Sequence, residues 1–156
     1  MNNKTELYQH ILAQTEVLIA GNGTVAERLE AICRLLRDEV HYFDWVGFYL
    51  VDEENPRELI LGPYVGDSTD HTRIAFGQGI CGQAAEREET FVVQDVAKED
   101  NYLSCSIHVK SEIVVPVFNG KKLVGELDID SHQLNPFSEE DRQYLEEVAA
   151  RVGPLL

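Results

Sequence analysis

Residues 111–130, with the sequence SEIVVPVFNGKKLVGELDID, decide the architecture that this chain can adopt. Two strand-like runs, 113–118 and 123–130, flank the dipeptide Asn119-Gly120. Asn-Gly between two such runs is typical of a tight turn that joins antiparallel strands. The stretch therefore predicts a β-hairpin.

The second strand of this hairpin carries a row of acids. Residues two apart on a strand point to the same face, so Glu126, Asp128 and Asp130 project together, while Leu127 and Ile129 project the other way. Burying three carboxylates is costly, and their mutual repulsion raises the pKa of at least one of them. Such a row suits an ammonium group and a polar oxygen. The alternative is a solvated sheet face, and the residues alone do not separate the two.

Upstream of the hairpin, strand-like runs alternate with turns. Four runs rich in aromatic or β-branched residues predict strands, at residues 45–51, 58–61, 71–76 and 91–93. In the first run, Trp45 and Tyr49 are four residues apart and share a face. Such a pair either walls a pocket or packs in a core, and the sequence alone favours core packing.

Helices are predicted at both ends of the chain. An apolar pattern over residues 7–19 is helical and stops at Gly21-Asn22-Gly23. Thr24 with Glu27, and Ser138 with Asp141, have the spacing of capping boxes that begin two further helices. A short helix is expected at about residues 82–88.

This order of elements predicts one α+β domain that spans residues 1–156. We expect a central antiparallel sheet with the N- and C-terminal helices packed on one face. The loops, with a pocket that they cover, are expected on the other face.

The chain carries a formal net charge of −15, spread along its length. Such a surface repels phosphate backbones, so neither nucleic acid nor an anionic membrane is an expected partner. No apolar run reaches the roughly 18 residues that a membrane-spanning helix needs. The first residues, MNNKTE, lack the basic and then apolar order of a signal peptide. The expected location is the cytoplasm.

Two of the three cysteines lie in unusual places. Cys81 is in the glycine-rich stretch 77–82, GQGICG, which is predicted to lead into a helix, and Cys105 is in a polar loop. A helix N-terminus is expected to lower the pKa of the Cys81 thiol, and its N–H groups suit a carboxylate. If the fold brings the two thiols together, they form a redox couple. Cys33 falls on an apolar helix face with Leu29, where packing is the expected role.

Metal-ligand spacing is absent from the sequence. Residues His41, His71, His108 and His132 are scattered, and no pair of cysteines has zinc spacing. A metal site that combines a histidine with Asp128 or Asp130 stays a minor alternative, and the expectation is no metal and no cofactor.

Several motifs, in this order, resemble the GAF domain and more closely the free methionine-R-sulfoxide reductases, which are GAF-fold enzymes. The segments that carry the resemblance are Trp45-Val46-Gly47-Phe48-Tyr49, Leu61-Gly62-Pro63-Tyr64, residues 77–82, residues 110–116 and residues 125–131. Together they span nearly the whole chain. The resemblance implies a cytoplasmic, homodimeric oxidoreductase that reduces free methionine sulfoxide.

In that family a cysteine before the Ser-Glu-Ile-Val motif attacks the sulfoxide sulfur, and a second cysteine resolves the resulting sulfenic acid into a disulfide. Matched by position, Cys105 is the attacking residue and Cys81 the resolving one. The resemblance implies that thioredoxin, or a similar dithiol, restores both thiols.

The resemblance also assigns a substrate pocket. Glu112, Asp128 and Asp130 match the acids that hold the substrate ammonium group and sulfoxide oxygen. Trp45 and Tyr49 match the wall around the methyl-sulfur end. Backbone N–H groups near Cys81 are expected to hold the substrate carboxylate.

Three positions depart from the family pattern. Residues 102–106, YLSCS, replace the usual His-Ile-Ala-Cys-Asp, so the acid after the cysteine is absent. Phe91 stands where many relatives carry another cysteine, and residues 67–73 lack a usual Ala-Cys pair. Two alternatives therefore stay open: a non-catalytic GAF module that binds or senses a small molecule, and a reductase for another oxidised sulfur compound.

Overall fold

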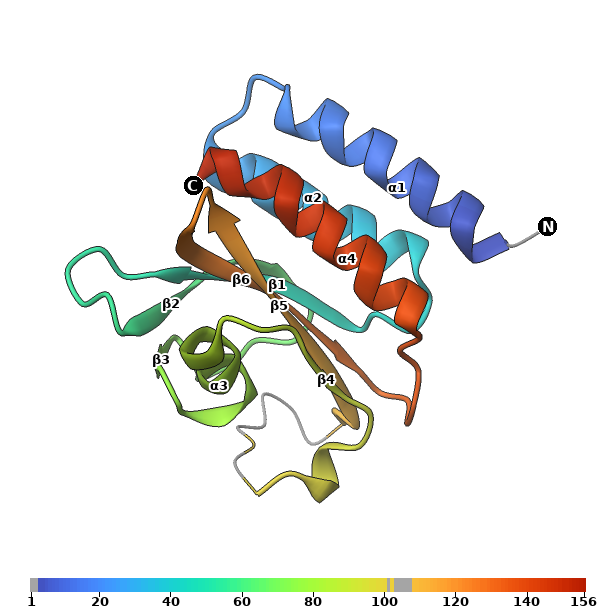
Figure 1. The fold of residues 1–156 in the computed structure, drawn as a ribbon. Coiled ribbons are helices and arrows are strands. Elements are labelled where there is room, and N and C mark those ends of the chain that lie inside the picture. The colour runs from blue at the N-terminus through green and yellow to red at the C-terminus, as the bar shows by residue number, and fades with distance from the viewer. Residues whose placement is uncertain (1–2, 101, 103–107) are drawn as a thin grey trace.

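A six-stranded sheet organises the protein. The structure is a computed structural model that describes residues 3–100, 102 and 108–156. The strands are β1 (Trp45–Val51), β2 (Glu58–Val65), β3 (Arg73–Ala75), β4 (Phe91–Val93), β5 (Ser111–Asn119) and β6 (Lys122–Ser131). Their order is β3-β2-β1-β6-β5-β4, and every neighbouring pair is antiparallel (Figure 1). The acid-bearing strand β6 is therefore central, as expected.

The predicted hairpin is present as β5 and β6, with its turn one residue later than expected. Asn119 pairs with Lys122, so the two turn residues are Gly120 and Lys121. Gly120 has φ +65°, a conformation that a residue without a Cβ adopts at little cost. Glycine at the first central position fits a tight hairpin turn of type II′. The Asn-Gly pair thus marks the hairpin correctly but does not itself form the turn.

Strand β2 runs past the point where the sequence predicts its end. The prediction stops at Leu61 because Gly62-Pro63 follows, yet the strand continues to Val65. A shift in register opposite Gly47 and Tyr49 places an extra residue in β2. Such a bulge lets a strand accept proline, because the missing N–H falls where the ladder is interrupted.

Three long helices cover one face of the sheet. They are α1 (Asn3–Ile19), α2 (Val25–Glu39) and α4 (Glu139–Val152). Helices α2 and α4 lie on the strands, and α1 packs across them as an outer layer (Figure 1). Both predicted capping boxes are present, at Thr24 and at Ser138.

The core lies between these helices and the sheet. Leu127 and Ile129 of β6 are fully buried there, as their alternation with the acids predicts. Cys33 of α2 belongs to the same cluster and is also fully buried, so its expected packing role is confirmed. Among the described residues, no helix has the length and apolar character to span a lipid bilayer.

Shorter elements cover the opposite face. Helix α3 (Gly79–Arg87) lies there, and the 3₁₀ helix η1 (Val96–Lys98) follows β4. Helix α3 begins three residues before its predicted start, and Cys81 is therefore inside its first turn. Gln78 occupies the N-cap position, but its side chain accepts a hydrogen bond from Ala75 N–H and caps no N–H group of the helix, so the sequence offers no capping signal there.

Candidate active site

The antiparallel register gathers the predicted site residues on the sheet face that α3 covers. Glu126, Asp128 and Asp130 of β6 lie opposite Tyr49, Gly47 and Trp45 of β1, respectively. On the other side of β6, Asp130 lies opposite Glu112 of β5. The acids and the two aromatic residues therefore share one surface, although they come from three strands.

The four carboxylates are buried. Glu126 is 0% exposed, Asp128 and Asp130 are 1% exposed, and Glu112 is 5% exposed. Among the described residues, neither carboxylate oxygen of Glu126 or Asp130 has a hydrogen-bond partner, and neither does Oδ1 of Asp128. A solvated sheet face, the alternative left open by the sequence, is therefore wrong. Buried polar atoms without partners are rare and typical of a site that receives a ligand.

Burial changes the ionisation of this row. It raises the pKa of Glu126, Asp128 and Asp130, and the charge of Asp128 raises the pKa of both neighbours further. Three acids buried side by side cannot all ionise at neutral pH. The row can therefore keep a proton that it donates to a bound oxygen atom.

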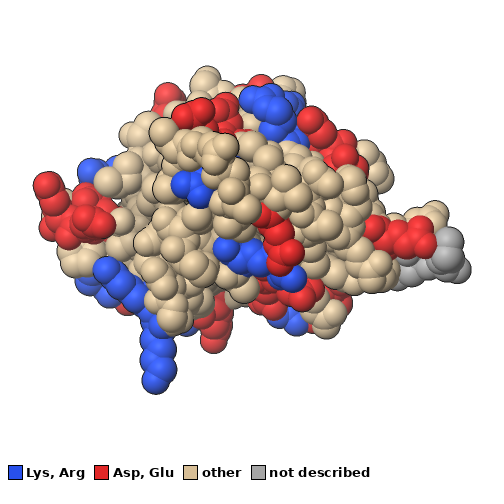
Figure 2. Space-filling view, turned by 90° about the horizontal axis from the view of Figure 1, so that it is seen from above, with Lys and Arg blue, Asp and Glu red and all other residues tan. Residues whose placement is uncertain are grey.

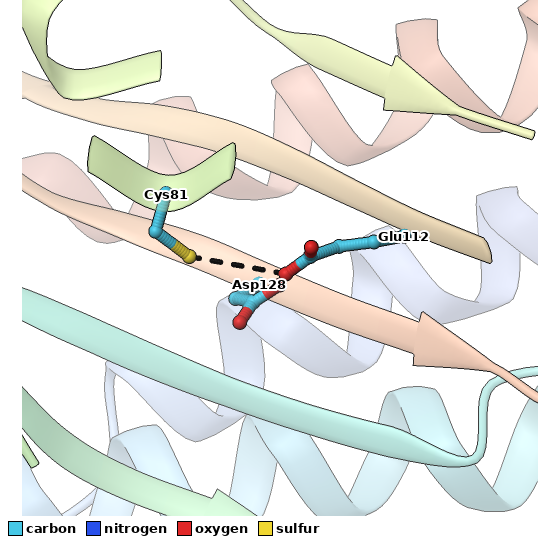
Figure 3. A group of neighbouring side chains, drawn as sticks. All are labelled: Cys81, Glu112 and Asp128. Atoms are coloured by element: carbon cyan, nitrogen blue, oxygen red, sulfur yellow. Dashed lines mark hydrogen bonds between the residues drawn. The ribbon is translucent and has the colours of Figure 1, made fainter. Parts of the chain in front are cut away.

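Cys81 points from α3 toward these acids (Figure 3). Its Sγ atom lies 3.9 Å from Oε2 of Glu112, and its side chain is 5% exposed. Burial raises the pKa of Cys81 well above its ordinary value, and Asp128 and Glu112 raise it further. The lowered pKa expected from the helix N-terminus is wrong, because desolvation and nearby negative charge outweigh the helix dipole.

The two aromatic residues form one side of this surface. Trp45 Nε1 donates to the Asp67 carbonyl at 2.9 Å, and its ring stacks on Tyr64 with centroids 5.2 Å apart. The Tyr49 hydroxyl donates to the His71 carbonyl at 2.9 Å. The ring centroids of Trp45 and Tyr49 are 6.5 Å apart. Both side chains are buried beside the acids. Trp45 and Tyr49 can therefore pack against their neighbours and also form a wall of the site.

Gly47 makes room for the tryptophan ring. A Cβ atom at this position would lie 2.5 Å from the Trp45 ring and 2.7 Å from Cβ of Tyr64. The glycine between the two aromatic residues is therefore part of the site, because only a bare backbone lets the ring lie across the strand.

A narrow cavity opens between α3, the strands and the segment before β3. Its lining comprises Tyr49, His71, Ile74, Gln78, Gly79, Ile80, Cys81, Glu112 and Asp128. The sequence pattern missed His71, Ile74 and Gln78. These residues lie next to or within the glycine-rich stretch in the sequence, which was the one sign of a role in the site. Only the fold shows that this segment lies beside the acids of β5 and β6.

The predicted nucleophile, Cys105, lies outside the described residues. The chain on either side of it can be followed. Tyr102 packs against the apolar cluster that contains Cys81. On the other side, Lys110 N–H donates to the carbonyl of Ser131, directly after Asp130. Both flanks of the segment thus reach the face that carries the site.

Comparison with known proteins agrees with this arrangement. A family model described as GAF domain matches residues 22–156. GAF domain-containing protein A of Dictyostelium discoideum is 41% identical over 146 residues, covering 94% of this chain and 90% of the relative. The free methionine-R-sulfoxide reductase of Escherichia coli (strain K12) is 33% identical over 154 residues, covering 99% and 91%.

A solved structure extends the similarity to three dimensions. The free methionine-R-sulfoxide reductase of Neisseria meningitidis, in complex with its substrate, superposes with a TM-score of 0.91 at 39% identity. The match covers 99% of this chain and 91% of that one. The chain therefore belongs to the GAF domain family and, within it, to the free methionine-R-sulfoxide reductase family.

Proposed function

We propose that this protein reduces free methionine-R-sulfoxide to methionine, with a dithiol as the reductant. One observation carries the proposal: a buried thiol, Cys81, faces the buried acids Glu112 and Asp128 in a chain that closely matches substrate-bound reductases. A thiol supplies the electrons for sulfoxide reduction, and an acid supplies the proton for the departing oxygen.

The site residues divide the substrate between them. The ionised members of the acid row hold the ammonium group, and a protonated member donates a hydrogen bond to the sulfoxide oxygen. The first-turn N–H groups of α3, at residues 79–81, hold the carboxylate. Trp45 and Tyr49 enclose the methyl-sulfur end. A methionine sulfoxide within a peptide lacks both terminal charges, so the free amino acid is preferred.

The reaction begins at Cys105. Its thiolate attacks the sulfoxide sulfur, an acid of the row protonates the oxygen, and the sulfur–oxygen bond breaks. The departed oxygen, now water, attacks the Cys105 sulfur and loses one proton, while the bond between the two sulfur atoms breaks and methionine leaves with its electron pair. Cys105 thereby becomes a sulfenic acid, the reversible first step of cysteine oxidation. Sulfoxide sulfur is reduced by two electrons, and Cys105 is oxidised by two.

Cys81 then resolves the sulfenic acid. Its sulfur attacks the sulfur of Cys105, and the hydroxyl group leaves as water with the proton that Cys81 releases. Because burial raises the pKa of Cys81, this thiol must give up its proton as it attacks. Thioredoxin or a similar dithiol reduces the disulfide by exchange. We further propose that the protein acts in the cytoplasm and is a homodimer. Equilibrium sedimentation of the purified protein tests the dimer.

Turnover tests the proposed activity. We expect the wild-type protein to convert free methionine-R-sulfoxide with dithiothreitol and, more efficiently, with thioredoxin. Cys105→Ser removes the nucleophile and should lower kcat by about 10³-fold or more. Cys33→Ser changes a thiol that lies in the core on the opposite sheet face and should retain turnover. Wild-type protein without activity, or Cys105→Ser with full activity, would contradict the mechanism.

One sequence feature favours a second candidate function, a small-molecule-binding GAF module. Ser106 follows Cys105 where the family commonly has an aspartate. Mass spectrometry separates the two functions. A disulfide between Cys81 and Cys105 after addition of the sulfoxide supports the enzyme. A retained ligand with both thiols unchanged supports the module.

A further inference from the structure

We propose that Cys81, Glu112 and Asp128 also form a binding site for a divalent transition-metal ion of the zinc class, and that a bound ion excludes the sulfoxide substrate. The metal site stands on the geometry of these residues. Only the second part, exclusion of the substrate, rests on the proposed function.

The three donor atoms converge from three different elements. Cys81 comes from α3, Glu112 from β5 and Asp128 from β6, and the side chains point toward one another (Figure 3). One donor atom from each lies within 4.8 Å of the other two, with Sγ of Cys81 3.9 Å from Oε2 of Glu112. In a tetrahedral zinc site, bonds of about 2.3 Å to sulfur and 2.0 Å to oxygen place neighbouring donors about 3.5 Å apart. Small side-chain movements therefore close the site around an ion.

The surroundings favour a cation. Oδ1 of Asp128 and both carboxylate oxygens of the neighbouring Glu126 are buried without a described hydrogen-bond partner. No described lysine, arginine or histidine forms an ion pair with Glu126, Asp128 or Asp130. A divalent ion would satisfy open oxygen atoms and neutralise the charge that these acids place on one another.

The donor set selects the class of metal. A thiolate with two carboxylates suits zinc and chemically similar ions, because magnesium and calcium prefer oxygen donors alone. Three protein ligands leave one position open, which is typical of zinc sites that admit a further molecule. The three donors line a narrow cavity together with Tyr49 and His71, and its volume of about 10 Å³ admits about one water molecule in this position.

Binding must release protons. The Cys81 thiol gives up its hydrogen as the sulfur–metal bond forms, and a proton held by Glu112 or Asp128 leaves as well, so the products are the metal-bound thiolate and carboxylates and the released protons in solution. Affinity should therefore rise with pH. The bound ion occupies the resolving thiol and two of the acids proposed to hold the substrate, so metal and sulfoxide should compete.

Cobalt(II) provides a direct test, because a cobalt–thiolate bond absorbs in the near ultraviolet. Wild-type protein, freed of metal with a chelator and reduced with a phosphine, should develop this band during titration with Co²⁺. Zn²⁺ should remove the band, and excess Mg²⁺ should leave it unchanged. In Cys105→Ser, which cannot turn over the substrate and so keeps Cys81 reduced, added methionine sulfoxide should shift the titration to higher Co²⁺ concentration.

Variants locate the ion. Cys81→Ala should lose the band, and Asp128→Asn should weaken Co²⁺ binding by about tenfold or more, since even outer groups that only orient a ligand contribute 10- to 100-fold. Cys33→Ala is the matched control and should keep the band. If circular dichroism shows that Cys81→Ala does not fold, Cys81→Ser, which keeps the size of the side chain but not the thiolate, replaces it and should likewise lose the band.

The outcomes separate this inference from the proposed function. A wild-type protein without the band, or Cys81→Ala with it, overturns the metal site even where turnover is normal. A band without sulfoxide turnover keeps the metal site and contradicts the reductase. Turnover that stays constant as Zn²⁺ saturates the site overturns the exclusion of substrate.

Discussion

Glu126 shows how strongly the site conflicts with the stability of the fold. Its side chain is fully buried, neither carboxylate oxygen has a described partner, and burial raises its pKa well above the ordinary value. Since the folded state binds this proton more tightly than the unfolded chain does, the contribution of Glu126 to stability is largest at low pH. It is lost as the pH rises from the ordinary range of a glutamate through the raised value.

We therefore predict that Glu126→Met stabilises the ligand-free protein. Methionine has a similar shape without a buried charge, so the free energy of unfolding should rise by about 1 to 3 kcal/mol at about pH 8. The gain should shrink toward about pH 5, where the wild-type carboxyl is protonated. Denaturant unfolding at both pH values measures it. An equal gain at both values would show that ionisation of Glu126 is not the cause.

Gly47 offers a second test at the scale of one residue. Gly47→Ala places a methyl group 2.5 Å from the Trp45 ring, which must move. We expect a loss of stability of about 1 to 3 kcal/mol from overpacking. The chain has one tryptophan, so its fluorescence reports this displacement directly.

The control for this test is Gly21→Ala, in the turn between α1 and α2, which should leave the emission spectrum unchanged. An unchanged spectrum in Gly47→Ala would contradict the role assigned to the glycine.

Among the elements, the start of α4 is joined to α1 by a single buried acid. The hydroxyl groups of Tyr8 and Tyr42 donate to Oδ1 of Asp141 at 2.6 Å and 2.7 Å, and Lys4 lies 3.1 Å from Oδ2. The same side chain completes the capping box with Ser138. Burial opposes ionisation, but the hydrogen bonds from Tyr8 and the others outweigh it, so the pKa of Asp141 is lowered.

Asp141→Asn should therefore lower the free energy of unfolding by about 3 kcal/mol at neutral pH, since a charged acceptor and part of a helix cap are lost. A lowered pKa stabilises the fold above the ordinary aspartate pKa, and this contribution is lost as the pH falls through the folded value. The difference from wild type should thus shrink in acid. Denaturant unfolding measures it, with the exposed Asp38→Asn as control. A constant difference across pH would contradict this account.

The elements were largely predictable where local chemistry determines them. The caps at Thr24 and Ser138 and the alternation along β6 follow from neighbouring residues alone. The start of α3 was misplaced because Gln78 gives no capping hydrogen bond. The raised pKa of Cys81 was missed because the acids that cause it lie on other strands. His71 was missed for the same reason. Its place at the cavity depends on the pairing of β2 with β1 and of β3 with β2, which the sequence near His71 does not reveal.

For the whole molecule, the two faces of the sheet have separate roles. The helix-covered face carries the main apolar core, and the other face carries the acids and the cavity. Figure 2 views the molecule from above the helices. It shows acidic and basic side chains interspersed on the helix-covered side. With a net charge of −15, this distribution gives no continuous basic surface in that view for a phosphate backbone.

We predict that the proposed substrate stabilises the whole fold. A ligand at about 100 times its Kd contributes about 2.7 kcal/mol, which should appear as a higher unfolding temperature. Asp128→Asn should reduce this rise, because one acid of the row no longer attracts the ammonium group. N-acetylmethionine sulfoxide, which lacks that charge, is the matched control ligand. An equal rise with both ligands would argue against recognition of the ammonium group.

The alternation along β6 has one more consequence, for the accuracy of folding. Leu127 and Ile129 face the helices, while Glu126, Asp128 and Asp130 face the side of the sheet that α3 covers. A slip of one residue against β1 would turn three carboxylates into the apolar layer beneath α2 and α4, where nothing could hold them. A chain with this wrong register would therefore lack a stable core as well as a site. The alternation along β6 thus destabilises the misfolded register relative to the native one.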